Sequence, residues 1–185
     1  MELQTAHLLL RPYSVADIAP LHRLWTNEGV RRYLWDGAVV PLERAAEVVR
    51  SSIEEWEIYG FGQWCVCDCH SGELIGFCGF RRDEPGMPPE LIYGLHPDWW
   101  GRGLATESAR AALAFGFQQK NFSAVWAITD PPNVKSVAVL RRLGMAFQRR
   151  GLLHGLETLF YRLTKAEWER ENARSLPSPP PTDTQ

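Results

Sequence analysis

Apolar residues near the start of the chain first run together and then recur at helical spacing. The segment His7–Arg11 is largely apolar and ends at Pro12, which predicts a first strand. Ser14 and Asp17 have the spacing of a capping box, and apolar residues from Val15 to Leu24 follow at the period of a helix. The chain is therefore expected to begin with a strand followed directly by a helix.

The remainder of the chain alternates between strand and helix patterns. Strands are predicted over residues 61–69, 74–81, 90–95, 123–129, 146–150 and 157–163. Helices are predicted from Pro41 to about Tyr59, over residues 106–117, from 133 to 143 and after Thr164, with a short helix or turn at 30–35. Together these elements predict one domain over residues 1–170.

Length and charge narrow the class of protein. A chain of 185 residues with 45% hydrophobic residues can bury a core in one domain. A net charge of −2 gives no basic field for nucleic acid, and neither a signal peptide nor a bilayer-spanning apolar segment is evident. A cytoplasmic protein is expected, without nucleic-acid or membrane partners and with reduced cysteines. Residues 171–185, rich in proline, predict a disordered tail.

Three of the four cysteines, Cys65, Cys67 and Cys69, alternate along one predicted strand. This spacing places them on one face of the strand. Zinc sites usually space their cysteines by about two to four residues at a turn, so small buried thiols explain the pattern better than a metal site does. We therefore expect no metal, and a zinc-binding module is the weaker alternative.

Residues 100–106, which we call the glycine turn, join a predicted strand to a predicted helix through Gly101 and Gly103. Such a turn directs unpaired backbone N–H groups and the positive end of the helix dipole at one point, where a phosphate or pyrophosphate binds well. A Walker A loop is excluded because Leu104 and Ala105 follow Gly103. The dinucleotide-binding fingerprint lacks its third small residue, and an ordinary strand-to-helix turn is the alternative.

Five separated segments together resemble the GNAT superfamily of acyl-CoA-dependent N-acetyltransferases, and most closely its ribosomal-protein N-terminal acetyltransferase branch. The segments are Leu8–Pro12, Gly72–Gly76, Tyr93–Glu107, Asn133–Leu140 and Leu143–Met145. They occur in the order of the family and extend over nearly the whole chain. The resemblance implies an α+β GNAT fold, with a central twisted, mainly antiparallel sheet of about six to seven strands flanked by helices.

The resemblance also implies that acetyl-CoA is the cosubstrate and that the glycine turn binds its pyrophosphate. The residues it assigns to the cofactor are Leu95, Trp100, Gly101, Arg102, Gly103, Leu104, Ala105, Thr106, Asn133 and Ser136. Trp100 departs from the usual Gln or Arg of the family, so backbone N–H groups and Arg102 are expected to contribute more. Backbone groups near Leu95 would pair with the pantetheine arm and polarise the thioester carbonyl.

Candidate catalytic residues follow from the same resemblance. Asn133 and Ser136 lie three residues apart at a helix start and therefore share one face. Asn133 would bond the pantetheine amide; the alternative is an ordinary N-cap that accepts from the N–H of Ser136, and both roles can hold at once. Ser136 would protonate the leaving thiolate. For the base that deprotonates the amine, Glu90 is the first candidate, with Glu157 and His154 as rivals.

Tyr33, Trp35 and Glu157 are the predicted acceptor-binding residues. Aromatic side chains beside Asp36 suit a cationic amine, whereas core packing is the alternative explanation. The implied reaction is direct attack of a primary amine on acetyl-CoA in a ternary complex, without a covalent enzyme intermediate. The acceptor is left open between a protein N-terminal amine and a small-molecule amine, and a homodimer is compatible. A non-catalytic acyl-CoA-binding or sensing module is the alternative function.

Overall fold

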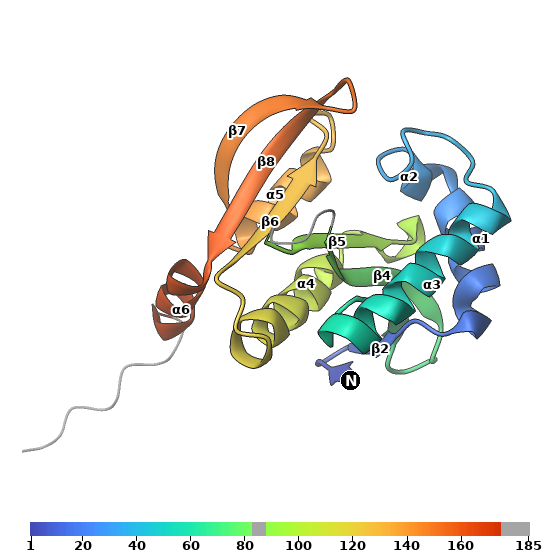
Figure 1. Ribbon diagram of the computed structural model, residues 1–185, viewed down its shortest axis with the longest axis horizontal. Helices are drawn as coiled ribbons and strands as arrows, with labels where there is room; N and C mark the ends of the chain where they lie inside the picture. The colour runs from blue at the N-terminus through green and yellow to red at the C-terminus, as the bar shows by residue number, and fades with distance from the viewer. Residues whose placement is uncertain (83–87, 175–185) are drawn as a thin grey trace, which may run out of the picture.

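The computed structural model describes residues 1–82 and 88–174, which form one sheet flanked by helices (Figure 1). The eight strands lie in the order β1-β2-β3-β4-β5-β6-β8-β7. Their bounds are β1 Leu3–Gln4, β2 Leu8–Pro12, β3 Gln63–Asp68, β4 Leu74–Arg81, β5 Glu90–Leu95, β6 Ala124–Thr129, β7 Ala146–Leu153 and β8 Leu156–Thr164. Every neighbouring pair is antiparallel except β5 and β6, which are parallel.

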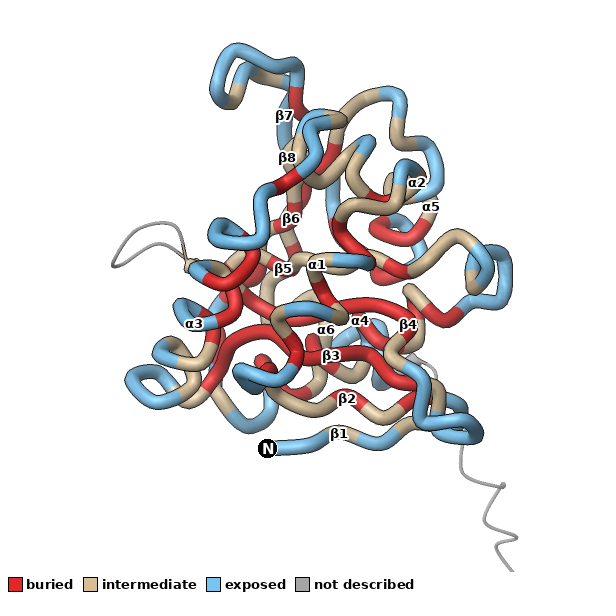
Figure 2. The backbone as a smooth tube through the Cα atoms, turned by 90° about the vertical axis from the view of Figure 1, so that its right-hand side faces the viewer, coloured by how far each residue is buried: buried red, intermediate tan, exposed pale blue. Residues whose placement is uncertain are grey.

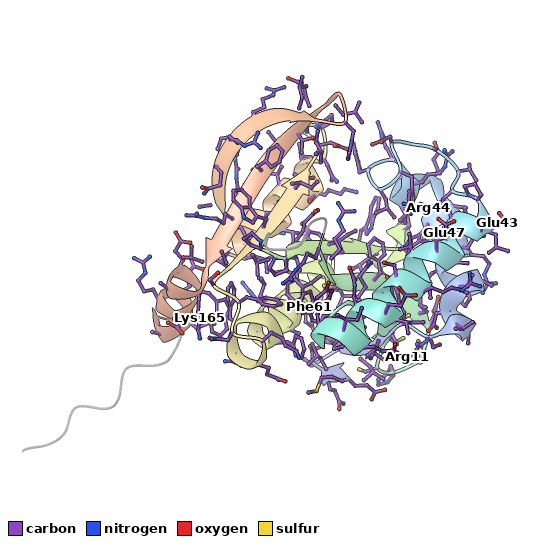
Figure 3. The ribbon with its side chains drawn as sticks, in the orientation of Figure 1. Arg11, Glu43, Arg44, Glu47, Phe61 and Lys165 are labelled. Atoms are coloured by element: carbon purple, nitrogen blue, oxygen red, sulfur yellow. The ribbon has the colours of Figure 1, made fainter. Side chains whose placement is uncertain are left out.

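Helices connect the strands and cover both faces of the sheet. Their bounds are α1 Ile18–Thr26, α2 Glu28–Arg31, α3 Leu42–Tyr59, α4 Leu104–Ala114, α5 Val134–Arg142 and α6 Lys165–Arg174. Ala45 and Val49 of α3 are buried, whereas Glu43, Arg44 and Glu47 project from its outer face (Figure 3). In the part of the chain that the structure describes, no helix is long and apolar enough to cross a membrane.

Each face of the sheet carries its own hydrophobic cluster. One cluster includes Leu113 of α4 and Leu140 of α5, packed on the strands. The other joins α1 and α3 to the opposite face through residues such as Trp25 and Phe77, whose rings meet edge to face at 6.0 Å. Figure 2 shows the central strands buried between these layers, whereas much of β7 is exposed at the edge of the sheet.

Strands β5 and β6 diverge after a single point of pairing. Their connection runs through α4, and a helical crossover of this kind makes the two strands parallel. Their one register pair is Glu90 with Trp126, where the N–H of Trp126 also donates to the carbonyl of Pro89 at 3.0 Å. Beyond that pair the strands separate toward their carboxyl ends, where ligands bind in open sheets with parallel crossovers.

The predicted order of elements is confirmed, and two predictions about their number and start are wrong. The sheet has eight strands rather than six to seven, since Leu3 and Gln4 pair with β2, and two residues carry too little pattern to predict a strand. Helix α4 begins at Leu104 instead of residue 106, because Gly103 adopts a left-handed conformation directly before it. The helix therefore begins inside the glycine turn.

Other boundaries differ at the end of the chain. Strand β7 extends to Leu153, three residues beyond its predicted end. Helix α6 continues to Arg174, so the first four residues of the predicted tail are helical. The carboxylate of Glu167 accepts from both the N–H and the hydroxyl of Thr164, which confirms Thr164 as the capping residue. Residues 83–87, in the loop expected between the strands at 74–81 and 90–95, and the rest of the tail, 175–185, lie outside the described residues.

The cysteine prediction holds for two of the three residues. Cys65 and Cys67 are buried in the cluster beneath α1 and α3, and burial raises the pKa of both thiols, which keeps them protonated. Cys69 instead lies beyond the end of β3 and is exposed. Among the described residues, no group of three or more His, Cys, Asp or Glu side chains could hold a metal ion.

Candidate functional site

A large groove, which we call the main groove, lies at the carboxyl end of β5 among the glycine turn, α2 and the first turn of α5. Its volume is about 1850 Å³, whereas a site for one drug-sized ligand has about 300–1000 Å³. It therefore has room for a long cofactor and a second substrate. The predicted residues on its wall are Tyr33, Leu95, Trp100, Gly101, Arg102, Gly103, Leu104, Ala105, Thr106, Asn133 and Ser136.

The glycine turn has the backbone geometry of an anion site. Gly101 and Gly103 have φ angles of 76° and 80°, a left-handed conformation that other residues rarely adopt. A Cβ at either position would meet nothing within 4 Å, so the space beside the turn is open. Gly103 is the N-cap of α4 and no side chain caps the helix. The first N–H groups of α4 are consequently available to a bound anion.

Trp100 and Arg102 are both engaged with residues that precede the glycine turn. The indole N–H of Trp100 donates to the carbonyl oxygen of Leu95 at 2.8 Å. The guanidinium of Arg102 donates to the carbonyl of Asp98 at 3.0 Å and lies over the Trp99 ring, 4.9 Å from its centroid. The side chain of Arg102 is therefore directed back over the short 3-10 helix Pro97–Trp99 rather than held over the glycines.

The outer edge of β5 presents backbone groups to the gap beside β6. The N–H of His96 donates to Ile75 on β4 at 2.8 Å. Because backbone groups of successive strand residues alternate in direction, those of Tyr93 and Leu95 point the other way, toward β6. No register pair joins β5 to β6 at these two positions within the described chain. The N–H of Leu95 therefore points into the gap, where the resemblance implies that the extended pantetheine arm lies.

Two hydroxyl groups meet where the gap opens onto α5. The Tyr93 hydroxyl lies 2.9 Å from the Ser136 hydroxyl and 3.3 Å from the Ser136 carbonyl. Burial raises the pKa of Tyr93, and the bond from Ser136 opposes this only in part, so the phenol stays protonated. Asn133 caps α5, because its side-chain oxygen accepts from the N–H of Ser136 at 3.2 Å. This cap holds the Ser136 side chain at the groove.

The structure separates the two predicted aromatic acceptor residues. Tyr33 lies on the main groove, with its hydroxyl 3.5 Å from the carbonyl of Pro132. Trp35 lines a smaller neighbouring cavity of about 340 Å³ instead, and its ring packs edge to face on Trp25 at 6.0 Å. Core packing, the alternative given for these aromatics, therefore describes Trp35 better than it describes Tyr33.

The predicted bases lie away from the described residues that line the main groove. Glu90 forms a two-point ion pair with Arg81, at 3.0 and 3.1 Å, at the opposite end of β5 from the glycine turn. Glu157 pairs with Arg150 at 2.6 Å on the exposed β7–β8 hairpin. His154 occupies the turn of that hairpin, with a φ of 50°. The sequence gave no sign that Glu90 and Glu157 would each pair with an arginine.

Two residues on the groove were missed as site residues. Tyr93 was part of a recognised segment, but only the fold brings its hydroxyl to Ser136. Lys135 places its ammonium 3.9 Å from the centroid of the Trp100 ring, directly beside the glycine turn. Its position between Asn133 and Ser136 gave no direct signal, because residues two apart on a helix do not share a face, and only the fold brings its ammonium to Trp100.

Residues 7–146, well over half of the chain, match the family described as the acetyltransferase (GNAT) domain. The matched range contains the glycine turn, both hydroxyl residues and the cap of α5.

Individual relatives agree with this result. The chain is 28% identical to the N-acetyltransferase p20 of Bacillus licheniformis over 157 residues, which cover 84% of this chain and 86% of the relative. It is 24% identical to the spermidine N(1)-acetyltransferase of Escherichia coli K12 over 147 residues, which cover 79% and 77%. A RimL ribosomal L7/L12 α-N-protein acetyltransferase, solved with coenzyme A, has the same fold, with a TM-score of 0.75, 19% identity and coverage of 89% and 98%.

Proposed function

This chain belongs to the GNAT acetyltransferase family, and from that premise we propose that its main groove holds acetyl-CoA and a primary amine together. The chain is an acetyl-CoA-dependent N-acetyltransferase, and the relatives named as enzymes do not favour a non-catalytic acyl-CoA-binding module. Beyond the family and its activity, the proposal states where acetyl-CoA binds, which residues contact each part of it, and that the amine attacks it directly. No covalent enzyme intermediate is included, because Cys65, Cys67 and Cys78 are buried away from the groove.

One observation carries the proposal. The gap between β5 and β6 leads straight into the glycine turn, so a strand edge with unpaired backbone groups and a helix N-terminus adjoin within one groove. An extended amide-containing arm that ends in a pyrophosphate fits both parts. The arm would bond the edge of β5 near Leu95, and the pyrophosphate would accept from N–H groups of α4.

The hydroxyl pair supports a role in departure of the thiolate. Acetyl-CoA supplies an acyl group on a thioester. Ser136 presents its hydroxyl at the opening of the gap, 2.9 Å from the Tyr93 hydroxyl, which burial keeps protonated. We propose that Ser136 gives its proton to the leaving sulfur and regains one, through solvent, from the amine nitrogen as the amide forms. Tyr93 stays protonated and holds the Ser136 hydroxyl in position. The N–H of Leu95 would stabilise the negative charge that develops on the carbonyl oxygen.

The amine must lose a proton before it attacks, and Asp130 is the carboxylate that we add to the three predicted bases. It directly follows β6, two residues before Pro132 on the groove wall. Burial and the neighbouring Asp36 raise the pKa of Asp130, which makes its carboxylate a better proton acceptor. Asp130→Asn is expected to flatten the acidic limb of the kcat/KM pH profile, and Asp36→Asn to shift that limb to lower pH. Unchanged profiles would return the role to Glu90 or a rival.

The acceptor is proposed as an amine that is cationic when free in solution. A spermidine acetyltransferase among the relatives uses a small polyamine, and the RimL structure belongs to an enzyme that acts on a protein α-amine. Both acceptors carry an ammonium that suits the face of Tyr33 on the groove. A panel of polyamines and short peptides, read by mass spectrometry of the acetylated product, separates the two classes. A cytoplasmic setting and a homodimer belong to the same proposal.

Thermal unfolding with acetyl-CoA, coenzyme A, ATP and NAD added separately tests the site. A ligand at one hundred times its Kd stabilises the folded state by about 2.7 kcal/mol. Stabilisation by acetyl-CoA and coenzyme A, but not by ATP or NAD, is the expected result. Equal stabilisation by ATP would show that the glycine turn binds phosphates without selecting coenzyme A, and no shift with any ligand would contradict the proposed site.

A further inference from the structure

The glycine turn lacks a charged or amide side chain at position 100, yet a cation lies directly over that position. The ammonium of Lys135, in the first turn of α5, is 3.9 Å from the centroid of the Trp100 ring. Both residues line the main groove, so the ammonium stands beside the open space next to Gly101 and Gly103. The contact joins α5 to the glycine turn across the groove.

Trp100 itself has no donor left for a phosphate. Its single polar hydrogen, on the indole nitrogen, is used on the Leu95 carbonyl at 2.8 Å. Arg102 is also directed elsewhere, with its guanidinium on Asp98 and the Trp99 ring. In this arrangement neither side chain is aimed at the open space beside Gly101 and Gly103.

Lys135 is suited to supply that charge. In the described part of the chain no carboxylate pairs with its ammonium, which makes its only recorded contact with the aromatic ring. A ring face attracts a cation more weakly than a phosphate does, and it leaves the remaining ammonium protons free to donate. The flexible stem of lysine also allows the ammonium to follow an anion that enters the groove.

We infer that Lys135 binds the pyrophosphate of coenzyme A across the glycine turn, with the Trp100 ring as the platform that holds its ammonium in place. The inference rests on the proposed function, because it takes the main groove as the coenzyme site. In this chain a lysine on α5 thus replaces the basic or amide residue that the turn lacks. Recognition of the pyrophosphate would then involve two elements rather than one.

Calorimetric titration of coenzyme A tests this inference without relying on activity. Lys135→Met keeps most of the side-chain length and removes the charge. It is expected to weaken coenzyme A binding about tenfold, the effect of one charge-assisted hydrogen bond, and to reduce the dependence of Kd on salt. Lys120→Met is the matched control, because Lys120 also lies over an aromatic ring, Phe115, but is outside the described lining of the groove. Its Kd should equal that of the unaltered protein.

Two further titrations assign the phosphate and the position. Dephospho-coenzyme A lacks the 3′-phosphate, so Lys135→Met should weaken its binding as much as it weakens binding of coenzyme A. Adding Trp100→Arg to Lys135→Met should recover at least threefold in affinity, since it restores a cation to the turn. A loss confined to coenzyme A would move the contact to the 3′-phosphate and overturn the inference. An unchanged Kd and salt dependence in folded Lys135→Met would also overturn it, whereas failure of the unaltered protein to bind coenzyme A would instead contradict the proposed function.

Discussion

The two walls of the main groove are built in different ways. On the cofactor wall, the glycine turn and the edge of β5 present backbone N–H groups, and two left-handed glycines set their direction. On the wall that we propose for the acceptor, the acceptor wall, side chains join the start of α1 to the sheet through the ion pair of Asp17 with Arg11 and the contact of Trp25 with Phe77. Gly29 of α2 lies close to Pro97 and Trp100. One wall depends on backbone conformation, and the other depends on which side chains meet.

This difference explains why the cofactor wall is easier to predict from the sequence than the acceptor wall is. A left-handed turn before a helix restricts the residues to glycine, so Gly101 and Gly103 mark it in the sequence. On the acceptor wall the limits come from contacts made in the fold, as at Gly29 beside Pro97 and Trp100, and such contacts leave no mark in the sequence. We expect substitutions on the cofactor wall to change coenzyme affinity, and those on the acceptor wall to change stability or the KM of the amine.

The largest expected effect is at the hydroxyl pair, where the gap beside β5 opens onto α5. Ser136→Ala removes the proposed proton donor to the sulfur and should lower kcat by about one hundredfold, the lower range for a general acid. Tyr93→Phe keeps the ring and removes only the second hydroxyl, so it should lower kcat less. The KM for acetyl-CoA should change little in either variant. Steady-state kinetics with both substrates varied gives these values.

A loss of affinity without a loss of kcat would contradict that assignment. It would mean that the Ser136 hydroxyl only binds the cofactor, and the pair would then belong wholly to the cofactor wall. The Asn133 side chain caps α5 by accepting from the backbone N–H at position 136, which alanine also has. Ser136→Ala should therefore leave the helix start intact. Circular dichroism and the melting temperature check this.

Some parts of the fold and of the site can be predicted from the sequence, and others cannot. The order of strands and helices is readable because apolar periodicity is local, and the glycine turn is readable because its backbone needs glycine. The contacts of Tyr93 with Ser136 and of Lys135 with Trp100 join residues 35 or more positions apart, with no pattern to link them. Nothing in a single sequence relates a residue on β5 to one on α5.

Charged and aromatic residues show the same limit. Glu90 and Glu157 have the chemistry of a base, but each is paired with an arginine that only the folded sheet brings near. Trp35 is an aromatic residue in the expected loop, yet it packs beside Trp25 and lines the smaller cavity. Residue type predicts what a side chain can do, whereas its partners decide what it does.

The second prediction concerns the ion pair that holds the acceptor wall. Burial by itself would raise the pKa of Asp17, but hydrogen bonds from Arg11 and Ser14 outweigh it, and the pKa falls to about 2. A lowered folded-state pKa stabilises the protein above pH ~4, and this stability is lost as the pH falls toward 2. The Asp17 side chain is only 5% exposed, so solvent screens the pair little. Asp17→Asn should cost about 2 kcal/mol of unfolding free energy at pH 7 and almost nothing near pH 2.

Denaturant unfolding at both pH values measures this effect. The control is Glu47→Gln, which removes the partner of Arg44 from an exposed ion pair on the outer face of α3 (Figure 3). Exposed pairs of this kind contribute about 0–1 kcal/mol, so this variant should change little at either pH. An equal loss for Asp17→Asn at pH 2 and pH 7 would show that the side chain acts by packing alone.

The third prediction separates strain from binding on the cofactor wall. Gly101→Ala and Gly103→Ala each force a left-handed conformation on a residue with a Cβ, which should lower stability by about 1 kcal/mol. Gly72→Ala is a matched control, since Gly72 has a φ of 72° and equally open space but lies in the β3–β4 turn. All three variants should lose similar stability, while only the first two should bind coenzyme A several-fold more weakly. Weaker binding by Gly72→Ala as well would mean that general destabilisation explains the effect.

The smallest expected effect is at the point where the two walls touch. A Cβ on Gly29 of α2 would lie 2.7 Å from Pro97 and 3.2 Å from the Trp100 ring, and neither ring can bend away. Gly29→Ala should therefore move α2, with Tyr33 behind it, and raise the KM of the amine about threefold while the KM of acetyl-CoA changes less. Glu28→Ala, on the exposed side of the same helix, gains helix propensity without this contact and should leave both KM values unchanged. If the KM of acetyl-CoA rose as much as that of the amine, α2 would have to be counted as part of the cofactor wall, because the contact with Trp100 would then transmit changes in both directions.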